Sequence, residues 1–265
     1  MKVVTAYPDG IFSWIDLAST DFAAAKAFYH GLFGWDALEI PMSEDYSYYM
    51  FQIDGYDVAG GSQMMEGMMP PGTPSHWSSY VNHSNVDAAV AKVADAGGTV
   101  ISPPFDVMES GRMAMIQDPT GAMVGIWQPN QHIGAKLVNQ PNTLIWNELQ
   151  TRDAEAAKAF YAAILDWEAH TDDNGYTVFK ANGRIQAGMM QMDDSWGPVP
   201  PNWAVYFMSE DIAATAAKAQ ELGGNVLVPV SQAGEMGHFA VIQDPAGAVF
   251  TAMQFNGPVD PPPGH

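Results

Sequence analysis

Hydrophobic and polar positions change their spacing along the chain in a fixed order. The segment FSWIDLA, which begins at Phe12, alternates large residues with small or polar ones, as a half-buried β-strand does. From Phe22 to Leu32 the apolar residues fall at three- and four-residue spacing, which predicts an amphipathic helix that Thr20 or Asp21 can cap. The chain is therefore predicted to begin with a strand followed by a helix.

Further strand-like segments follow this helix, and the whole order then recurs. The segments after the helix cover residues 35–39, 48–53 and 57–63, with a hairpin turn at Asp54-Gly55. The second cycle has a strand over residues 77–81, a helix over residues 86–96 that ends at Gly97-Gly98, and strands that end over residues 123–128. Each cycle is a βαβββ unit, so the pattern predicts an α+β fold.

This pair of units occurs twice in the chain. WIDLASTDFAAAKAFYHGLFGW, from Trp14, matches WNELQTRDAEAAKAFYAAILDW, from Trp146, at ten of twenty-two positions. Three later segments of the first copy also match the second copy. They are YYMFQIDGYDVAGGSQM, which pairs with YTVFKANGRIQAGMMQM, HWSSYV, which pairs with NWAVYF, and GRMAMIQDPTGA, which pairs with GHFAVIQDPAGA. We therefore predict four βαβββ modules in two duplicated domains, residues 10–130 and 142–256, with a polar linker between them.

These motifs resemble those of the vicinal oxygen chelate superfamily, which includes glyoxalase I, bleomycin-resistance proteins, fosfomycin-resistance enzymes and extradiol dioxygenases. The resemblance rests on AKAFY followed by GW or DW, on the GG pair after the second helix, and on the DPTG and DPAG turns before the last strand. Within the superfamily the chain most resembles the duplicated, actinobacterial antigen-type glyoxalase-like proteins. The resemblance implies two cup-shaped domains that handle a small molecule.

In the metal-using members of this superfamily, His and Glu ligands project into the cup from the first and last strands of each module. In this chain the corresponding positions hold Trp14, Gly60, His76, Gly125, Trp146, Gly188, Asn202 and Thr251. Indole and glycine cannot coordinate a metal, and one histidine does not supply the three or four ligands of a catalytic site. We therefore expect no metal and no other cofactor, and we expect the glycines to leave room for an organic ligand.

Strand alternation predicts which other side chains share this face, because alternate residues of a strand point the same way. By this count Asp16 lies beside Trp14, and Glu148 lies beside Trp146. The predicted ligand-binding residues are Trp14, Asp16, His76, Tyr80, Trp127, Trp146, Glu148, Asn202 and Tyr206. Such a set can stack on a planar or cationic ligand, and a desolvated carboxylate within it can act as a general base.

Five of these residues also have a structural interpretation. Trp14 and Trp146 are large enough to fill the cup as core residues. Asp16 and Glu148 could accept buried structural hydrogen bonds, and His76 could bond at the entrance to a strand. The DPTG and DPAG motifs predict tight turns rather than chemistry, since proline and glycine suit their second and last positions. Arg112 and its counterpart His238 are interpreted as rim residues.

The amino-acid composition excludes several classes of binding partner and site. The chain has 30 acidic and 10 basic residues, a formal net charge of −20, which repels nucleic acid and anionic membranes. It has no cysteine, so disulfides, thiolate metal sites and cysteine nucleophiles are excluded. No signal-peptide pattern and no long apolar run is present, which predicts a cytoplasmic protein with no membrane partner, either a monomer or a homodimer.

The predicted function is the binding of a small, largely aromatic or apolar molecule in a cup-shaped cavity without the superfamily metal site, in resistance or secondary metabolism. The first alternative is a lyase, isomerase or hydroxylase-type enzyme that uses side-chain acid/base groups or a relocated metal. The second is an interaction protein whose cups are filled. The sequence does not decide whether a reaction is catalysed, and it does not identify the ligand.

Overall fold

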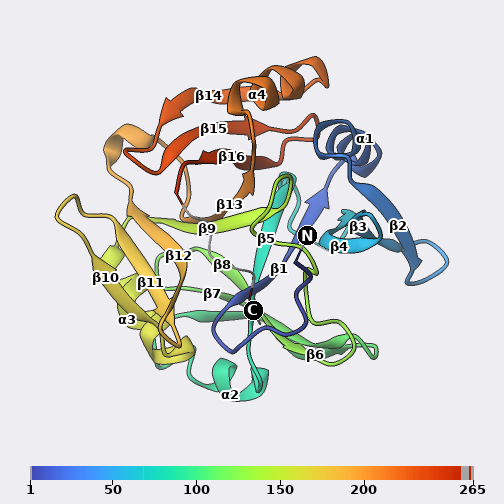
Figure 1. Cartoon of the computed structure of the whole chain (residues 1–265). Coiled ribbons are helices and arrows are strands. Elements are labelled where there is room, and N and C mark those ends of the chain that lie inside the picture. The colour runs from blue at the N-terminus through green and yellow to red at the C-terminus, as the bar shows by residue number, and fades with distance from the viewer. Residues whose placement is uncertain (1, 68, 258–262, 264–265) are drawn as a thin grey trace.

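The computed structural model describes residues 2–67, 69–257 and 263. The strands of these residues form two eight-stranded sheets, one from each half of the chain (Figure 1). The first half contains β1 (Phe12–Ser19), α1 (Phe22–Phe33), β2 (Asp36–Pro41), β3 (Ser47–Ile53), β4 (Tyr56–Gln63), β5 (His76–Asn82), α2 (Val86–Ala91), β6 (Thr99–Val107), β7 (Gly111–Gln117) and β8 (Met123–Pro129). The second half contains β9 (Leu144–Thr151), α3 (Ala154–Leu165), β10 (Glu168–Thr171), β11 (Thr177–Ala181), β12 (Arg184–Gln191), the 3₁₀ turn η1 (Asp194–Trp196), β13 (Asn202–Met208), α4 (Ile212–Glu221), β14 (Asn225–Gln232), β15 (Gly237–Gln243) and β16 (Val249–Phe255).

The two sheets have the same topology. Their strand orders are β2-β3-β4-β1-β5-β8-β7-β6 and β10-β11-β12-β9-β13-β16-β15-β14. Each sheet joins two modules through an antiparallel pairing of their first strands, β1 with β5 and β9 with β13. Within each module the first strand pairs in parallel with the last. The described part of the chain therefore confirms the predicted α+β fold of four βαβββ modules.

Local sequence explains where the helices begin and end. The N-cap side chains of α1, α2, α3 and α4 each accept a hydrogen bond from a main-chain amide of the first turn, and these caps are Asp21, Asn85, Asp153 and Asp211. The regular part of α2 is shorter than the predicted helix over residues 86–96. Its amides at Lys92 and Val93 bond carbonyls three residues back, so the helix tightens into turns before Gly97.

None of the helices in the described residues is long and apolar enough to cross a membrane.

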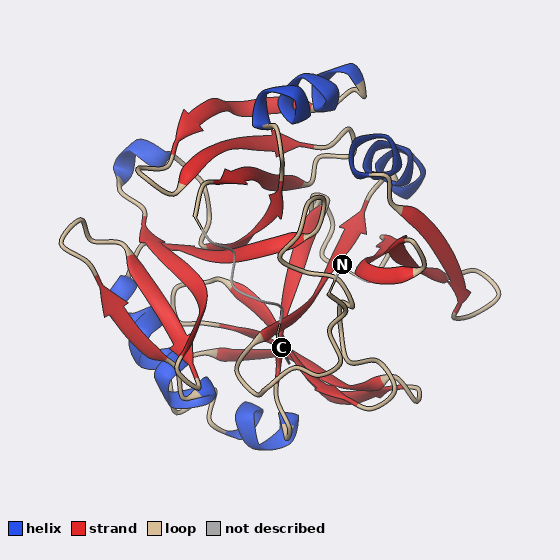
Figure 2. Cartoon of the chain, viewed as in Figure 1, coloured by secondary structure: helices blue, strands red, loops and turns tan. Residues whose placement is uncertain are grey.

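The core lies between the two halves. Figure 2 shows the helices around the periphery of the molecule in this view and the strands in its middle. Helix α1 lies beside α4 of the other half, and α3 lies beside α2 (Figure 1). The central strands meet through a buried hydrogen bond of 2.7 Å from the Ser79 hydroxyl to Asn147 Oδ1. Because buried residues of both halves form one hydrophobic cluster, the halves share a core.

Two reciprocal hydrogen bonds connect the repeated motifs across the halves. The Tyr29 hydroxyl, in the first AKAFY segment, donates to Asp244 of the DPAG turn at 3.1 Å. The Tyr161 hydroxyl, in the second AKAFY segment, donates to Asp118 of the DPTG turn at 3.0 Å. Oδ1 of Asp118 also accepts main-chain hydrogen bonds within its own turn. The DPTG and DPAG motifs thus form turns, as predicted, and their aspartates, for which no role was predicted, bond within the turns and to the opposite half.

Candidate functional site

The predicted site lies on the face of each sheet that points away from the shared core, which we call the cup face. In β1, Ile15 and Leu17 are fully buried in the core. Trp14 and Asp16 alternate with them and therefore point to the cup face, where Trp14 is still only 6% exposed, as its interpretation as a core residue anticipates, and Asp16 is half-buried. Trp14 lies opposite Tyr80 of β5 in the strand register. The equivalent pairing of β9 with β13 produces the same arrangement in the second half.

Four side chains on the first cup face form a hydrogen-bonded group, the first-half cluster, which consists of Trp14, Asp16, Tyr48 and Tyr80. Trp14 Nε1 donates to the Tyr48 hydroxyl at 3.0 Å. The Tyr48 hydroxyl donates to Asp16 Oδ2 at 3.3 Å, and the Tyr80 hydroxyl donates to the same oxygen at 3.1 Å. The sheet thus holds one half-buried carboxyl group between two phenols and close to an indole.

The second cup face carries an equivalent second-half cluster, which consists of Trp146, Glu148, Tyr176 and Tyr206. Trp146 Nε1 donates to the Tyr176 hydroxyl at 3.2 Å. The Tyr176 hydroxyl donates to Glu148 Oε2 at 2.8 Å, and the Tyr206 hydroxyl donates to Glu148 Oε1 at 2.7 Å. Glu148 is only 5% exposed. The duplication has therefore kept a carboxyl group with two tyrosines and a tryptophan in both halves.

Burial disfavours the charged form of both carboxyl groups. It raises the pKa of Asp16 to about 6, against the opposing hydrogen bond from Tyr80, the charge of His76 and the hydrogen bond from Tyr48. Burial also raises the pKa of Glu148, against its two tyrosine hydrogen bonds. The phenols of Tyr48 and Tyr80 have pKa values well above their usual range, because they are buried beside a carboxyl group. They therefore remain hydrogen-bond donors, while Asp16 can exchange a proton near neutral pH.

The glycines at the inherited ligand positions make room for tyrosine side chains. This corrects our expectation that they leave open space for a ligand. A Cβ atom at each glycine would collide with a tyrosine, at 1.8 Å for Gly60 and Tyr48, 1.9 Å for Gly188 and Tyr176, and 2.1 Å for Gly125 and Tyr80. Any ligand must therefore lie over the clusters rather than replace them.

Two predicted residues are placed outside the clusters. His76 and Asn202 occupy equivalent positions at the start of β5 and β13. The side chain of each bonds to the carbonyl of the proline two residues earlier, at 2.9 Å in both cases. This is the strand-entrance role that we considered for His76. The histidine still lies close enough to Asp16 to influence its pKa electrostatically.

His132, which the sequence analysis did not identify, lies between Trp127 and the first-half cluster and contacts both. Trp127 Nε1 donates to the His132 carbonyl at 2.9 Å. The His132 ring packs edge-on against Trp14, with ring centroids 4.5 Å apart, and lies 5.9 Å from the Trp127 ring. Burial lowers the pKa of His132, so its imidazole is neutral at pH 7. His132 therefore adds an aromatic wall to the first cup.

The linker places His132 there because its backbone bonds to the beginnings of β1 and β4, two neighbouring inner strands of the first sheet. The amide of Ala135 donates to the Ser13 carbonyl at 2.8 Å, and the amide of Lys136 donates to the Asp57 carbonyl at 2.7 Å. Gly134 has a φ of +110°, and a Cβ atom there would lie 2.2 Å from the Ser13 carbonyl oxygen. The residue at this position must be glycine for the linker to approach β1 so closely.

Tyr48 and Tyr176 were also missed by the sequence analysis. They occupy equivalent places in the two copies, so the repeat alignment contained a signal for them. That signal was a tyrosine kept in both copies near a glycine kept in both copies, Gly60 and Gly188. Only the folded sheet shows that each glycine accommodates the matching phenol.

The donor set does not fit the metal of the metal-using relatives. No group of three or more His, Cys, Asp or Glu side chains among the described residues is arranged to hold a metal ion. Three of the inherited positions are glycines on which any ligand side chain would collide with a tyrosine. The chemistry available on the cup faces is therefore that of carboxyl, phenol, indole and imidazole groups.

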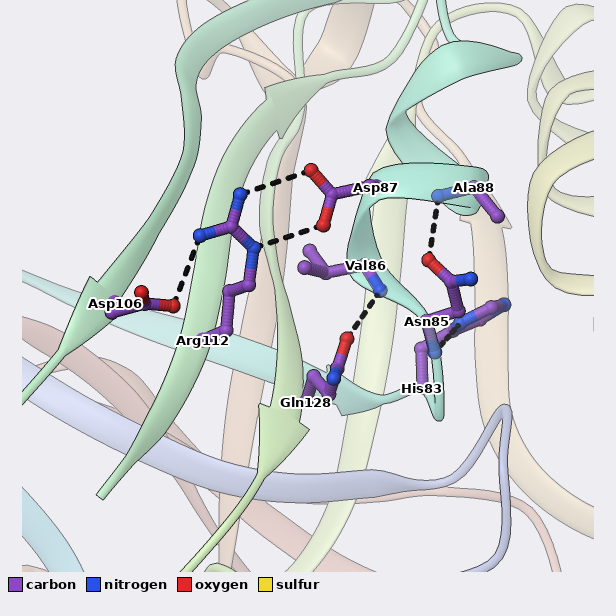
Figure 3. Close-up of polar contacts among 8 residues, drawn as sticks. All are labelled: His83, Asn85, Val86, Asp87, Ala88, Asp106, Arg112 and Gln128. Carbon is purple, nitrogen blue, oxygen red and sulfur yellow. Dashed lines mark hydrogen bonds and ion pairs between the residues drawn. The ribbon is translucent and has the colours of Figure 1, made fainter. Parts of the chain in front are cut away.

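Arg112 connects α2 to β6 through ion pairs (Figure 3). Its guanidinium donates to both carboxylate oxygens of Asp87 in α2, at 2.9 and 3.0 Å, and to Asp106 of β6 at 2.9 Å. Gln128 of β8 accepts a hydrogen bond of 2.9 Å from the Val86 amide at the start of the same helix. The guanidinium lowers the pKa of Asp87. Arg112 is therefore a structural ion-pair residue.

Comparisons with known proteins agree with this architecture. The family model described as the glyoxalase/bleomycin resistance protein/dioxygenase superfamily matches residues 11–126, and a glyoxalase-like domain model matches residues 146–253. CFP32 of Mycobacterium tuberculosis, provisionally named a glyoxylase, is 42% identical over 254 residues, which are 94% of this chain and 96% of CFP32. The anthracycline biosynthesis protein DnrV of Streptomyces peucetius is 34% identical over 264 residues, 95% of each chain.

Solved structures are similar in fold at much lower sequence identity. A Mn(II)-bound glyoxalase from Novosphingobium aromaticivorans superposes with a TM-score of 0.65 and 17% identity, over 96% of this chain and 85% of that one. The 2,3-dioxygenase LapB from Pseudomonas sp. KL28 gives a TM-score of 0.64 and 12% identity, over 96% and 95% of the two chains. At these identities the likeness concerns the fold alone.

Proposed function

Since the chain belongs to the glyoxalase/bleomycin resistance protein/dioxygenase superfamily, we propose that it binds a small, largely aromatic molecule on the cup face, without the metal of its metal-using relatives. The observation that carries this proposal is the first-half cluster, in which the half-buried carboxyl group of Asp16 lies between two phenols and close to an indole on the cup face. A half-buried carboxyl group with a raised pKa on an outer face is a candidate for a binding or catalytic role.

The surroundings of the first-half cluster suit a flat apolar ligand. Met50 pairs in register with Gly60, and Met115 pairs with Gly125, so both methionines lie on the cup face. Both are half-buried, and methionine adapts its shape to different apolar partners. Trp127 on the same face is only 7% exposed, and an aromatic ring system could stack on the part of this face that remains exposed. DnrV is an anthracycline biosynthesis protein, and anthracyclines are flat, hydroxylated polycyclic molecules, which is consistent with this ligand class.

A panel of ligands tests the proposal directly. Hydroxylated polycyclic aromatics such as alizarin, a dihydroxyanthraquinone, should raise the melting temperature of the purified protein and quench its tryptophan fluorescence. Apolar aliphatic compounds of similar size should have smaller effects, because they cannot stack on indole or bond to a carboxyl group. If no member of an aromatic panel binds, the proposal is wrong.

A second candidate is acid/base catalysis on the same ligand, and one observation favours it. The pKa of Asp16 is raised to about 6, so this carboxyl can take up or release a proton near neutral pH. Mass spectrometry of the ligand after long incubation tests this candidate. An unchanged ligand, without loss or rearrangement of atoms, identifies a binding protein, whereas a product that disappears in Asp16→Asn identifies a lyase or isomerase.

A further inference from the structure

The two clusters contain the same kinds of functional group, but the carboxyl group accepts its hydrogen bonds differently in each. In the second-half cluster each oxygen of Glu148 accepts one phenol hydrogen bond. In the first-half cluster both phenols donate to Oδ2 of Asp16. No residue that the structure describes donates a hydrogen bond to Asp16 Oδ1. This oxygen is also not fully buried, since it is absent from the set of fully buried side-chain atoms that lack a partner. Asp16 Oδ1 therefore remains open to solvent, within a side chain that is only half-buried.

Side-chain length explains this difference. The extra methylene of Glu148 carries its carboxyl group between the two phenols, so that each oxygen meets one of them, at 2.7 and 2.8 Å. The shorter Asp16 meets both phenols with one oxygen, at the longer distances of 3.1 and 3.3 Å. A half-buried carboxyl oxygen with no partner in the protein is a ready acceptor for a ligand group.

The walls of the two cups differ as well. His132 packs against Trp14 in the first cup, and Met50 and Met115 lie on either side of the cluster in the sheet register. Val178 and Val241 pair with the equivalent positions in the second sheet. Methionine and imidazole side chains offer a larger and more adaptable contact surface than valine does. The open carboxyl oxygen and the larger aromatic and thioether surface therefore occur in the same half.

We propose that the first half carries the working ligand site, in which Asp16 Oδ1 accepts a hydrogen bond from a ring hydroxyl of the aromatic ligand, while the second-half cluster is a closed structural network. This inference rests on the proposed function. A ring hydroxyl is the hydrogen-bond donor that the hydroxylated aromatic ligands of the proposed function carry. The protein then binds one ligand per chain, although its site-forming residues are duplicated.

The matched variants Asp16→Asn and Glu148→Gln test the inference in the full-length protein. In Asp16→Asn the amide oxygen can still accept both phenol hydrogen bonds, whereas the amide NH₂ replaces the open acceptor with a donor. We expect one alizarin molecule per chain in the wild type by fluorescence titration and calorimetry. Asp16→Asn should weaken alizarin binding about tenfold, as expected for the loss of a hydrogen bond to a carboxylate. Glu148→Gln should leave the affinity unchanged within about twofold.

Anthraquinone, which has the same ring system without hydroxyl groups, is the control ligand. Its affinity should be lower than that of alizarin for the wild type and equal for the wild type and Asp16→Asn. Two alizarin molecules per chain, or a loss of binding in Glu148→Gln alone, would overturn the inference and leave the proposed function standing. Absence of binding by both quinones in the wild type would count against the proposed function itself, and the inference would fall with it.

Discussion

Replacing Gly60 with alanine should destabilise the protein by displacing Tyr48. The new Cβ atom would lie 1.8 Å from the Tyr48 hydroxyl oxygen and 2.5 Å from Cζ, far inside van der Waals contact. Tyr48 is half-buried, so its ring can move more easily than the strand. Once the ring moves, the hydrogen bonds from Trp14 to Tyr48 and from Tyr48 to Asp16 are lost.

The loss of two hydrogen bonds at about 0.5–1.5 kcal/mol each gives an expected decrease of about 1–3 kcal/mol in the free energy of unfolding. Measured overpacking of well-filled sites destabilises proteins by a similar amount, about 1–3 kcal/mol. This figure describes the same displacement of the tyrosine ring, so it is not added to the loss of the hydrogen bonds. Urea unfolding followed by tryptophan fluorescence measures this difference. The slope of the transition should not change, because the substitution affects stability and not the surface exposed on unfolding.

The Tyr48→Ala background provides the control. Without the phenol, the methyl group introduced by Gly60→Ala has space, so this substitution should cost less than about 0.5 kcal/mol there, which is the usual range for substitutions outside special sites. The difference between the two backgrounds isolates the contact between residues 48 and 60. Equal costs in both backgrounds, or no cost in the wild type, would refute the idea that this glycine is present to accommodate the tyrosine.

Three further expectations concern stability, metal content and pH. Tyr29→Phe should lower the free energy of unfolding by about 1–3 kcal/mol in urea titrations, because Asp244 loses its hydrogen-bond donor from the other half. An unchanged unfolding midpoint would contradict the role of this pair in joining the halves. Elemental analysis should find no stoichiometric Ni, Zn, Fe or Mn, and EDTA should not shift the melting temperature; about one metal per chain would restore a metal-dependent function. The pKa of Asp16 is raised from 3.8 to about 6 on folding, so its protonated form favours the folded state below about pH 4, and this contribution is lost as the pH rises through 6. Between pH 4 and pH 7 the wild type should therefore lose more stability than Asp16→Asn, and identical profiles would show that Asp16 does not titrate in this range.

The fold was predictable from the sequence because its signals are local and repeated. The alternation in β1 and the three- and four-residue spacing in α1 depend on neighbouring residues alone. Strand parity also placed Asp16 beside Trp14 and Glu148 beside Trp146 correctly on the cup faces, because parity follows from strand geometry. The exact bounds of the two domains, residues 10–130 and 142–256, remain a prediction.

The rest of the site could not be predicted, because it depends on contacts between distant strands. The Tyr48 hydroxyl reaches Asp16 only because a glycine lies beneath it in β4, and strand parity does not show such diagonal contacts. His132 belongs to a segment whose composition indicates a linker, and its ring meets Trp14 only because Gly134 allows the chain to pass close to β1. Linker composition predicts an exposed segment and gives no information about such an approach.

The repeat has different consequences for the core and for the cups. In the core, each AKAFY tyrosine bonds the DPxG aspartate of the opposite half, so each pair needs one motif from each half, and both copies of both motifs must persist for both pairs to form. On the cup faces, each cluster is complete within its own half, so one copy can change without affecting the other. The difference between Asp16 and Glu148 at equivalent positions is such a change, since a single methylene decides whether one carboxyl oxygen is left without a partner in the protein. Duplication thus constrains the residues between the halves and permits divergence on the outer faces, where a ligand would bind.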